Sequence, residues 1–328
     1  MPRVLISGGA GFLGSYLCEY YLDAGFQVYC LDNLSTSTGR NIKHLKANPN
    51  FYFYKIDIVK KLPSKIRNKK YKLVLNLASP ASPPQYQRLA IETLQAGSQG
   101  TLNMLEVAAA SKARFFHAST SEVYGDPEIH PQPESYWGKV HSYGPRSMYD
   151  ESKRYAEALI FSYKKAHGVN SCIARFFNTY GPRMDPEDGR VVSNFIMQAL
   201  SNKPLTIYGD GSQTRSFCYV DDLVQGIVSL INSDVEGPIN LGNPGEFTIK
   251  ELASKIILRT GSSSKVTYLP LPGDDPLQRK PDISLAKKVL KWSPKIELDK
   301  GLDKTIAYFE DFINQTPAAK LKTPKPLM

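Results

Sequence analysis

Three glycines near the amino terminus, Gly8, Gly11 and Gly14, constrain the fold of this chain more than any other feature. They lie between a short apolar run at residues 4–6 and a stretch of helical character that starts at Phe12. In a strand–turn–helix unit, glycines at this spacing permit a tight turn, the close approach of a pyrophosphate, and close packing of the helix on the strand. The helix would direct its free amides and its positive dipole end at the phosphates. We therefore predict a dinucleotide-binding turn at the start of a parallel α/β sheet.

The rest of the first half alternates β-rich runs with helical stretches, a rhythm typical of parallel strands joined by right-handed crossovers. We expect a Rossmann-type doubly wound parallel sheet. Its strands should fall at residues 3–7, 27–31, 52–57, 73–77, 114–119 and 171–176, and its helices at 12–24, 86–111 and 149–166. The stretch 125–145 is rich in Pro, Gly, His and Trp and lacks periodicity, which is typical of a functional loop.

The pattern changes from about residue 184, where the elements become shorter and are interrupted by Pro and Gly. Amphipathic helices are expected at 190–202, 221–232, 248–260 and 300–314. We divide the chain into a nucleotide-binding domain at 1–183, which also carries the reacting tyrosine and lysine described below, and a mainly substrate-binding lobe at 184–314. The Pro- and Lys-rich tail at 315–328 is predicted to be disordered.

An acidic residue, Asp32, closes the second expected strand. Its carboxylate can accept hydrogen bonds from both hydroxyls of an adenosine ribose and would repel a 2′-phosphate, so it favours NAD over NADP. Arg40 lies close by in the sequence and weakens this preference, because an arginine there can bind a 2′-phosphate. Asp57 ends the third expected strand, where a carboxylate either holds the adenine amine or is an ordinary turn residue.

A tyrosine, a lysine and a threonine supply the candidate reacting groups. Lys153 follows Tyr149 by four residues, so the two side chains should share one face of a helix, and the ammonium charge would favour the phenolate. Lowering a tyrosine pKa from about 10 to about 7 needs roughly 4 kcal/mol. Thr120, just after the fifth expected strand, would hydrogen-bond the same substrate oxygen. This arrangement predicts a phenolate that takes a proton from an alcohol while NAD accepts a hydride.

Composition narrows the remaining classes of function. The net charge of +10 comes partly from the Lys-rich stretch 60–72, but no recognition motif accompanies it, so we expect a solvated surface and no nucleic-acid partner. No apolar run approaches the ~18 residues of a membrane span, and the first is too short for a signal peptide, so a cytoplasmic protein without a membrane partner is expected. The four cysteines form no paired motif, which predicts buried free thiols, and the histidines form no metal-ligand spacing with them.

Longer stretches resemble a known family. They are Leu77-Ala78-Ser79-Pro80-Ala81-Ser82-Pro83-Pro84, Ser119-Thr120-Ser121-Glu122-Val123-Tyr124-Gly125-Asp126-Pro127, Asp188-Gly189-Arg190-Val191-Val192-Ser193-Asn194-Phe195, Gly211-Ser212-Gln213-Thr214-Arg215 and Gln278-Arg279-Lys280-Pro281-Asp282-Ile283. Up to about residue 314, the chain resembles the extended short-chain dehydrogenases/reductases of the nucleotide-sugar epimerase/dehydratase type, above all their UDP-glucuronate decarboxylase branch.

The resemblance implies a reaction without net redox. NAD would oxidise C4 of the glucuronosyl ring, the resulting β-keto acid would lose carbon dioxide, C5 would be protonated, and C4 would be reduced again to give UDP-xylose. The resemblance also implies a homodimer joined through a four-helix bundle of the helices at 86–111 and 149–166.

The resemblance assigns roles residue by residue. The implied catalytic residues are Thr120, Glu122, Tyr149, Lys153 and Arg279. The implied NAD contacts are Gly8, Gly11, Phe12, Leu13, Gly14, Asp32, Asn33, Ser35, Thr36, Asp57, Ile58, Leu77, Ala78, Ser79, Tyr149 and Lys153. The implied UDP-sugar contacts are Pro80 and Tyr86 around the sugar, Ser121, Asn178 and Arg190, then Leu205 and Tyr208 beside the uracil, and Arg215 and Arg279 at the diphosphate.

Within the family, Ser121 argues for decarboxylation. Related 4,6-dehydratases carry an aspartate there that protonates the departing C6 hydroxyl. A decarboxylase expels neutral carbon dioxide instead, and an aspartate would repel the carboxylate of the substrate. We assign Arg279 to charge stabilisation, since a guanidinium hardly deprotonates, and we leave the C5 proton to Glu122 or to water.

Two departures from the family pattern lie near the sugar, Ser152 where close relatives have glycine and residues 141–143 in place of an asparagine–proline pattern. Two other functions therefore stay open. One is a UDP-glucuronate 4-epimerase or another UDP-sugar epimerase or dehydratase, against which Ser121 and Glu122 argue because plain epimerases more often carry Ser-Ala-Thr there. The other is a catalytically silent NAD- or RNA-binding relative, which would be expected to have lost Tyr149 or Lys153.

Overall fold

The computed structural model describes residues 1–271 and 278–316. Its main sheet consists of β1 (Arg3–Ser7), β2 (Gln27–Asp32), β3 (Phe51–Lys55), β4 (Leu73–Asn76), β5 (Arg114–Thr120), β6 (Ser171–Phe176) and β11 (Pro238–Leu241). These seven strands lie in the order β11-β6-β5-β4-β1-β2-β3, and every neighbouring pair is parallel. The chain thus runs outward from β1 in both directions, which confirms the predicted doubly wound sheet.

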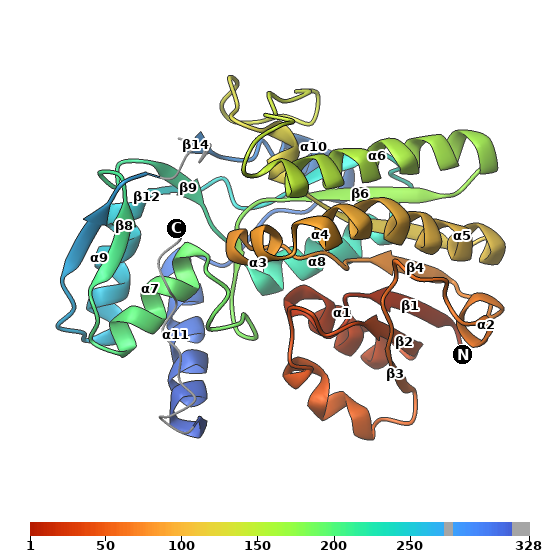
Figure 1. Cartoon of the computed structure of the whole chain (residues 1–328), viewed down its shortest axis with the longest axis horizontal. Helices are drawn as coiled ribbons and strands as arrows, with labels where there is room; N and C mark the ends of the chain where they lie inside the picture. Colours follow the sequence, from red (N-terminus) through yellow and green to blue (C-terminus); the bar gives the residue numbers. More distant parts are fainter. Residues whose placement is uncertain (272–277, 317–328) are drawn as a thin grey trace.

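Helices cover both faces of this sheet (Figure 1). Val4 and Ile6 of β1 belong to one core cluster with residues of α1 (Phe12–Asp23) and α8 (Val220–Ile231). Leu5, between them, belongs to a second cluster with residues of α5 (Thr101–Ser111) and α6 (Ser147–His167). Successive side chains of a strand point to opposite faces, so a sheet covered on both sides needs an uninterrupted apolar run, which this strand has.

The long helix predicted at 86–111 is interrupted. Helix α3 (Pro83–Arg88) ends at Leu89, whose backbone angles of −114° and 47° are not helical, and α4 (Ala90–Gln95) passes through a π-helical turn, η2 (Ala96–Gly100), into α5. Within that turn, a Cβ on Gly97 would lie 2.6 Å from Ser152 Cβ of α6. The glycine therefore permits the close contact between these helices, a steric effect that an apolar pattern does not reveal.

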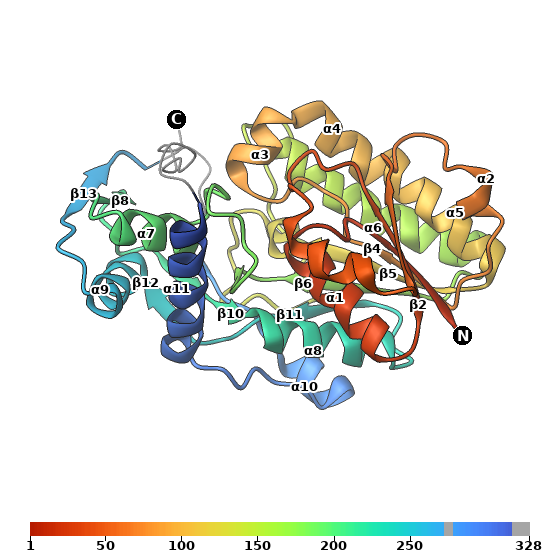
Figure 2. The ribbon, with the colours of Figure 1, turned by 90° about the horizontal axis from the view of Figure 1, so that it is seen from below.

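The second half of the chain builds a smaller lobe beside the carboxyl-terminal edge of the sheet (Figures 1 and 2). Its helices are α7 (Val191–Leu200), α9 (Ile249–Thr260) and α11 (Leu298–Gln315). Its strands are the pair β8 (Leu205–Tyr208) and β13 (Val266–Leu269), the trio β12 (Glu246–Thr248), β9 (Thr214–Ser216) and β14 (Gln278–Arg279), and the pair β7 (Thr179–Tyr180) and β10 (Cys218–Tyr219). The sheet and the lobe meet at the edge where all the main strands end.

The predicted division at residue 183 is not a clean cut. After β10 the chain returns to the main sheet as α8 and β11, because buried Ile239 and Leu241 complete the apolar edge beside β6. It then enters the lobe again and returns as α10 (Ser284–Leu290), after which Trp292 Nε1 donates to Asp222 O of α8 at 3.0 Å. From residue 317 onward, the tail that is predicted to be disordered lies outside the described residues.

Three short elements complete the described chain, namely η1 (Arg40–Ala47), α2 (Ser64–Arg67) and η3 (Ser121–Tyr124). Among the described residues, no helix combines the length and the apolar character that a membrane crossing requires. In the same ranges, no group of three or more His, Cys, Asp or Glu side chains is arranged to hold a metal ion. All four cysteines are buried and free, as their spacing predicts.

Candidate active site

The glycine turn joins β1 to α1 and has no space for side chains. Gly8 has a φ of +71°, and its amide donates to Leu31 O of β2 at 2.8 Å. A Cβ on Gly14 would lie 2.1 Å from Gly8 O, and a Cβ on Gly8 would lie 2.8 Å from Ala78 N. Gly11 is the N-cap of α1 and provides no side-chain cap. The amides of the first helical turn therefore remain available to an anion.

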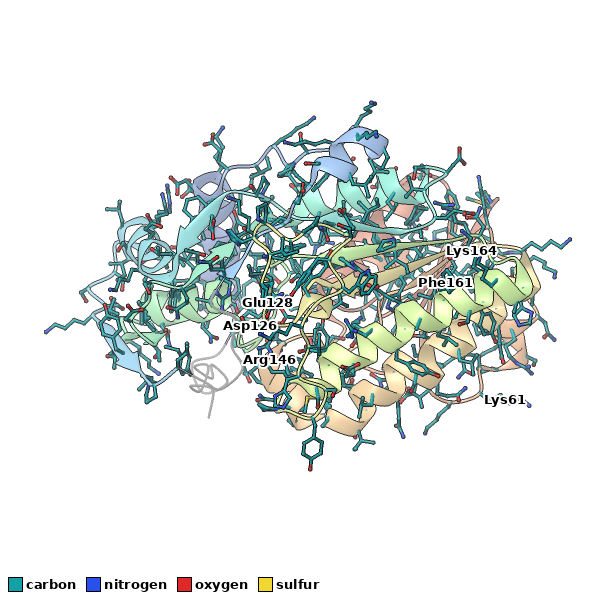
Figure 3. All side chains as sticks on the ribbon, turned by 90° about the horizontal axis from the view of Figure 1, so that it is seen from above. Lys61, Asp126, Glu128, Arg146, Phe161 and Lys164 are labelled. Atoms are coloured by element: carbon teal, nitrogen blue, oxygen red, sulfur yellow. The ribbon has the colours of Figure 1, made fainter. Side chains whose placement is uncertain are left out.

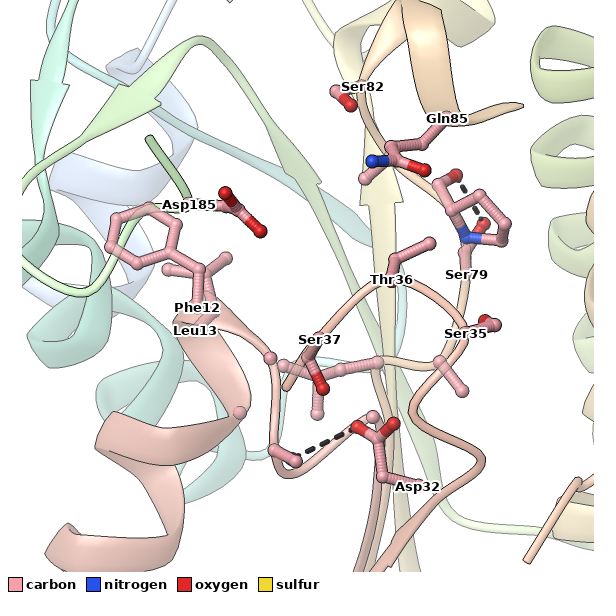
Figure 4. Close-up of a pocket in the computed structure, with 18 of the residues that line it drawn as sticks. Phe12, Leu13, Asp32, Ser35, Thr36, Ser37, Ser79, Ser82, Gln85 and Asp185 are labelled. Carbon is pink, nitrogen blue, oxygen red and sulfur yellow. Dashed lines mark hydrogen bonds between the residues drawn. The ribbon is translucent and has the colours of Figure 1, made fainter. Parts of the chain in front are cut away.

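A cavity of about 470 Å³ opens along the carboxyl ends of β1, β2 and β4. Its wall includes every residue predicted to contact NAD: Gly8, Gly11, Phe12, Leu13, Gly14, Asp32, Asn33, Ser35, Thr36, Asp57, Ile58, Leu77, Ala78, Ser79, Tyr149 and Lys153. Figure 4 shows Asp32 at the base of this cavity, with Phe12 and Leu13 on one side and Ser35 and Ser79 on the other. The residues of this wall follow the ends of β1, β2, β3 and β4, except Tyr149 and Lys153 of α6, and the parallel sheet brings them together.

Hydrogen bonds hold Asp32 and Asp57, two of the carboxylates that line this cavity. Asp32 Oδ2 accepts from Ala10 N at 3.0 Å, and Oδ1 accepts from Leu34 N at 2.8 Å. Burial raises the pKa of Asp32, and the two backbone bonds only partly offset that rise. Asp57 accepts from Asn33 Nδ2 at 3.3 Å and from Val59 N at 2.9 Å. Since each carboxylate oxygen has a second lone pair, Asp32 can still accept from ribose hydroxyls.

Tyr149 and Lys153 share one face of α6, but the amine does not lie at the phenol oxygen. Lys153 Nζ donates to Ala118 O at 2.8 Å and lies 5.8 Å from the centroid of the Tyr149 ring. Burial raises the pKa of Tyr149, and a side-chain hydrogen bond with Thr120 lowers it. Burial has the larger effect, and the resulting pKa is about 12. Burial also lowers the pKa of Lys153 to about 8. The protein by itself therefore keeps the phenol neutral, and the predicted phenolate needs further positive charge in the cavity.

Three predicted substrate contacts surround Tyr149. Tyr86 of α3 stacks on it, with ring centroids 4.9 Å apart and an angle of 9° between the planes. Pro80 and Arg190 line the same cavity, and the charge of Arg190 opposes the rise in the pKa of Tyr149. Asp188 fixes that guanidinium, with Nε donating to Oδ2 at 2.5 Å and Nη2 to Oδ1 at 3.0 Å.

A cluster of buried and half-buried charges lies beside the end of β5. Arg279 is only 2% exposed, and it donates to Ser121 O at 2.8 Å and to Glu122 Oε2 at 3.1 Å. Arg146, at the start of α6 (Figure 3), donates to the same Glu122 oxygen at 2.5 Å. Burial raises the pKa of Glu122, but Arg279 and Arg146 outweigh it and bring the value to about 2. Glu122 is therefore an anion at neutral pH, and by itself it is a poor proton donor.

Sequence reasoning missed three charged residues of this region, Arg146, Asp150 and Asp188. Asp150 follows Tyr149 in α6, is 6% exposed, and has a pKa raised to about 7 by burial and by the charge of Glu122. Nearness to the Tyr–Lys pair and to the Asp188-Gly189-Arg190 stretch was the only signal available in the sequence. A sequence does not show which of several acidic residues in a helix faces inward.

The remaining predicted contacts lie farther into the lobe. Leu205 of β8 is fully buried in the core, and its predicted place beside the uracil stays a prediction. Tyr208 O accepts from Gln213 Nε2 at 2.6 Å, at the rim of a second cavity of about 340 Å³. Arg215 of β9 contributes to the low pKa of Glu122, and half-buried Asn178 accepts from Cys218 N at 2.8 Å. Arg279 pairs with Arg215 across β14 and β9, and both guanidinium charges act on Glu122; their contact with the diphosphate stays a prediction.

The chain matches known proteins over most of its length. Residues 5–305 match the family model described as GDP-mannose 4,6 dehydratase. UDP-glucuronic acid decarboxylase 1 of Danio rerio is 48% identical over 333 residues, which cover 99% of this chain and 78% of that protein. UDP-glucuronic acid decarboxylase 3 of Arabidopsis thaliana is 49% identical over 301 residues, which cover 92% of this chain and 86% of that protein.

Solved structures agree with this similarity. The UDP-glucuronic acid 4-epimerase of Bacillus cereus, in complex with UDP-glucuronic acid and NAD, has a TM-score of 0.86 and 30% identity, over 94% of this chain and 99% of that one. The UDP-glucose 4-epimerase of Thermotoga maritima, with UDP-glucose, has a TM-score of 0.87 and 27% identity, over 95% and 99% of the two chains. The fold is thus shared with UDP-sugar epimerases over nearly the whole chain.

Proposed function

Because the chain belongs to the GDP-mannose 4,6 dehydratase family of NAD-dependent epimerases and dehydratases, we propose that it converts UDP-glucuronate into UDP-xylose and carbon dioxide, with NAD as a recycled oxidant. Its similarity to UDP-glucuronic acid decarboxylases over almost the whole chain carries this proposal. The site supports it with Tyr149 as the proton acceptor near buried Arg279 and half-buried Arg146, a combination suited to oxidise an alcohol on a sugar that also bears a carboxylate.

The cavity fits NAD. The amides of the first turn of α1 would hold the pyrophosphate where Gly8 and Gly14 leave space, Asp32 would accept from the adenosine ribose, and Lys153 would reach the nicotinamide ribose. When bound, NAD supplies the oxidation of C4 and the later return of the same hydrogen, and its cationic ring adds the positive charge that the phenol lacks.

Tyr149 and Thr120 would act at the C4 hydroxyl. Their mutual hydrogen bond places two hydroxyls together, so Thr120 can hold the substrate oxygen while Tyr149 accepts its proton. The stacked ring of Tyr86 limits the orientations of the phenol. Lys153, beneath the ring, stabilises the phenolate that forms. After decarboxylation, the same phenol returns the proton to O4.

The charged cluster would act at C5 and C6. Oxidation at C4 creates a ketone β to the carboxylate, so the electron pair of the C5–C6 bond can pass into an enolate as carbon dioxide leaves. Arg279 and Arg146 supply positive charge for the carboxylate and the enolate. The neutral hydroxyl of Ser121, whose carbonyl accepts from Arg279, adds no charge that would repel the substrate.

Product mass tests this function. Purified protein is incubated with UDP-glucuronate and NAD, and the nucleotide sugars are separated and weighed by mass spectrometry. The expected product is lighter than the substrate by one carbon dioxide and co-elutes with UDP-xylose. An isomer of unchanged mass indicates the second candidate, a UDP-glucuronate 4-epimerase, which the fold similarity to the Bacillus cereus epimerase favours. The absence of any conversion contradicts both.

We also propose a homodimer built on α4 and α6. Four large apolar side chains of these helices remain exposed, namely Ile91 at 63%, Leu94 at 40%, Tyr155 at 52% and Phe161 at 62%. Burying them against the same helices of a second copy would give the predicted four-helix bundle. A cytoplasmic location is consistent with four free, buried thiols, which persist in a reducing compartment.

A further inference from the structure

Asp150 is a buried carboxyl group next to Tyr149 to which the proposed mechanism gives no role. Its side chain is 6% exposed, and its Oδ1 has no hydrogen-bond partner among the described residues. A carboxylate removed from water without a partner costs several kcal/mol, so a buried carboxyl of this kind tends to keep its proton. Asp150 therefore carries a proton in the site, on a carboxyl group whose Oδ1 has no hydrogen-bond partner among the described residues.

Asp150 lies one helical turn beyond Arg146, the residue that binds Glu122, and its amide donates to Arg146 O at 3.2 Å, so the two side chains share a face of α6. The other charged or titratable groups that act on Asp150 are those of Arg279 in β14, Tyr86 in α3, and the adjacent Tyr149 and Glu151. Burial and the charge of Glu122 raise the pKa of Asp150 to about 7, while the two arginines hold Glu122 as the anion. Below the pH at which Asp150 ionises, the two neighbouring carboxyls therefore hold one proton between them, and that proton belongs to the pair.

We propose that Asp150 and Glu122 form a proton-sharing carboxyl pair that delivers the proton taken up at C5 after carbon dioxide has left. This inference rests on the proposed function. Glu122 is the member held at the reacting end by both arginines, so Asp150 is a positioning residue that passes its proton on through Glu122. It resolves the difficulty that Glu122, paired with two guanidinium groups, has no proton of its own to give.

The step balances in atoms and charge. The C5–C6 bond breaks, its electron pair enters the enolate between C4 and C5, and carbon dioxide departs. A C5–H bond then forms with the shared proton, which restores the C4 ketone and leaves both carboxyls ionised. Solvent returns one proton to the pair before the next turnover.

The same proton matters for substrate binding. Three guanidinium groups, those of Arg279, Arg146 and Arg215, act on Glu122, so the cluster keeps a positive charge that complements the carboxylate of UDP-glucuronate. When the pair loses its proton, a second carboxylate cancels part of that charge and the complement weakens. We therefore expect KM to rise, as well as C5 protonation to slow, when the pH passes the value at which the pair ionises.

The test compares Asp150→Asn with a matched control, Glu151→Gln. The control removes an acidic group from the next position of the same helix, where Glu151 is 36% exposed and pairs with Arg154 at 3.7 Å. Each enzyme is given UDP-glucuronate and NAD, and carbon dioxide, UDP-xylose, the UDP-4-ketopentose and NADH are measured between about pH 6 and pH 9. General acid catalysis contributes about 10²-fold or more, so Asp150→Asn should form UDP-xylose on the order of 10²-fold more slowly.

Two further observations are specific to a shared proton. Asp150→Asn should still release carbon dioxide, but its enolate should leave the enzyme unprotonated and take the C5 proton from solvent, so that free UDP-4-ketopentose accumulates with an equal amount of NADH. Glu151→Gln, whose exposed carboxylate is not part of the pair, should keep the wild-type product ratio at the acid end of this pH range. The wild type should release a rising fraction of ketopentose above about pH 7, and Asp150→Asn should lose this pH dependence. Asp150→Glu, which retains a titratable group, should restore part of the UDP-xylose yield.

The inference fails if Asp150→Asn keeps the wild-type product ratio and pH profile. Should that variant not fold, as judged by circular dichroism, the wild type decides alone: a ketopentose fraction that stays constant from about pH 6 to pH 9 overturns the proposal. A wild-type protein that releases no carbon dioxide contradicts the proposed function instead, so the two failures are distinguishable.

Discussion

Replacing Gly14 by alanine should abolish NAD binding through a backbone collision. The new Cβ would lie 2.1 Å from Gly8 O, where ordinary contact begins at 3.4 Å, so α1 must move away from the turn by about 1.3 Å. Phosphate–amide hydrogen bonds of about 2.9 Å would then lengthen beyond 4 Å and cease to exist. Losing two such charge-assisted bonds costs roughly 3–6 kcal/mol, or about 10²- to 10⁴-fold in Kd.

Isothermal titration with NAD measures this effect directly, and a thermal melt of each protein shows whether the fold survives. Gly237→Ala is the matched control, because a Cβ there has no neighbour within 4 Å and its binding should equal that of the wild type. A Gly14→Ala protein that binds NAD within twofold of the wild type would refute the argument that this turn holds the pyrophosphate.

Three other changes give separate outcomes. Tyr149→Phe should reduce product formation by at least about 10²-fold, since the proton acceptor is lost, while titration shows NAD binding largely retained. Asp222→Ala should lower the free energy of unfolding by about 2–4 kcal/mol in urea denaturation, because the buried carboxylate accepts from Lys295 N at 2.9 Å and Ile296 N at 2.7 Å; an unchanged midpoint would contradict this. Phe161→Asp should convert a dimer to a monomer in sedimentation, and a wild type that is already monomeric removes the proposed interface.

Local signals predicted most of the cofactor site. The glycines of the turn, Asp32 and the Tyr149–Lys153 pair each depend on neighbours within one strand–turn–helix unit or one helical turn, so their spacing indicates their position. The parallel sheet then brings their strand ends to one edge. Because of this geometric rule, residues that lie far apart in the sequence can be assigned to the same cavity from their positions at strand ends alone.

Features that depend on contacts between distant segments could not be predicted from the sequence. The four-residue spacing indicates that Lys153 shares a helix face with Tyr149, but not that its amine lies beneath the ring and bonds Ala118 O. Arg146 precedes α6 in an irregular loop, and only folding brings it to Glu122. The break at Leu89 and the return of β11 to the sheet likewise depend on contacts between distant segments.

The interleaved path of the chain has a mechanical consequence. Because the polypeptide passes repeatedly between the sheet and the lobe, through α8 and β11 and again through α10, no single linker acts as a pivot. Any rotation of one part against the other must therefore deform several connecting segments at the same time, so the two parts do not swing apart about one hinge. For the same reason, one proteolytic nick between the parts should leave both fragments associated, and the lobe is not a module that can be transplanted onto another scaffold.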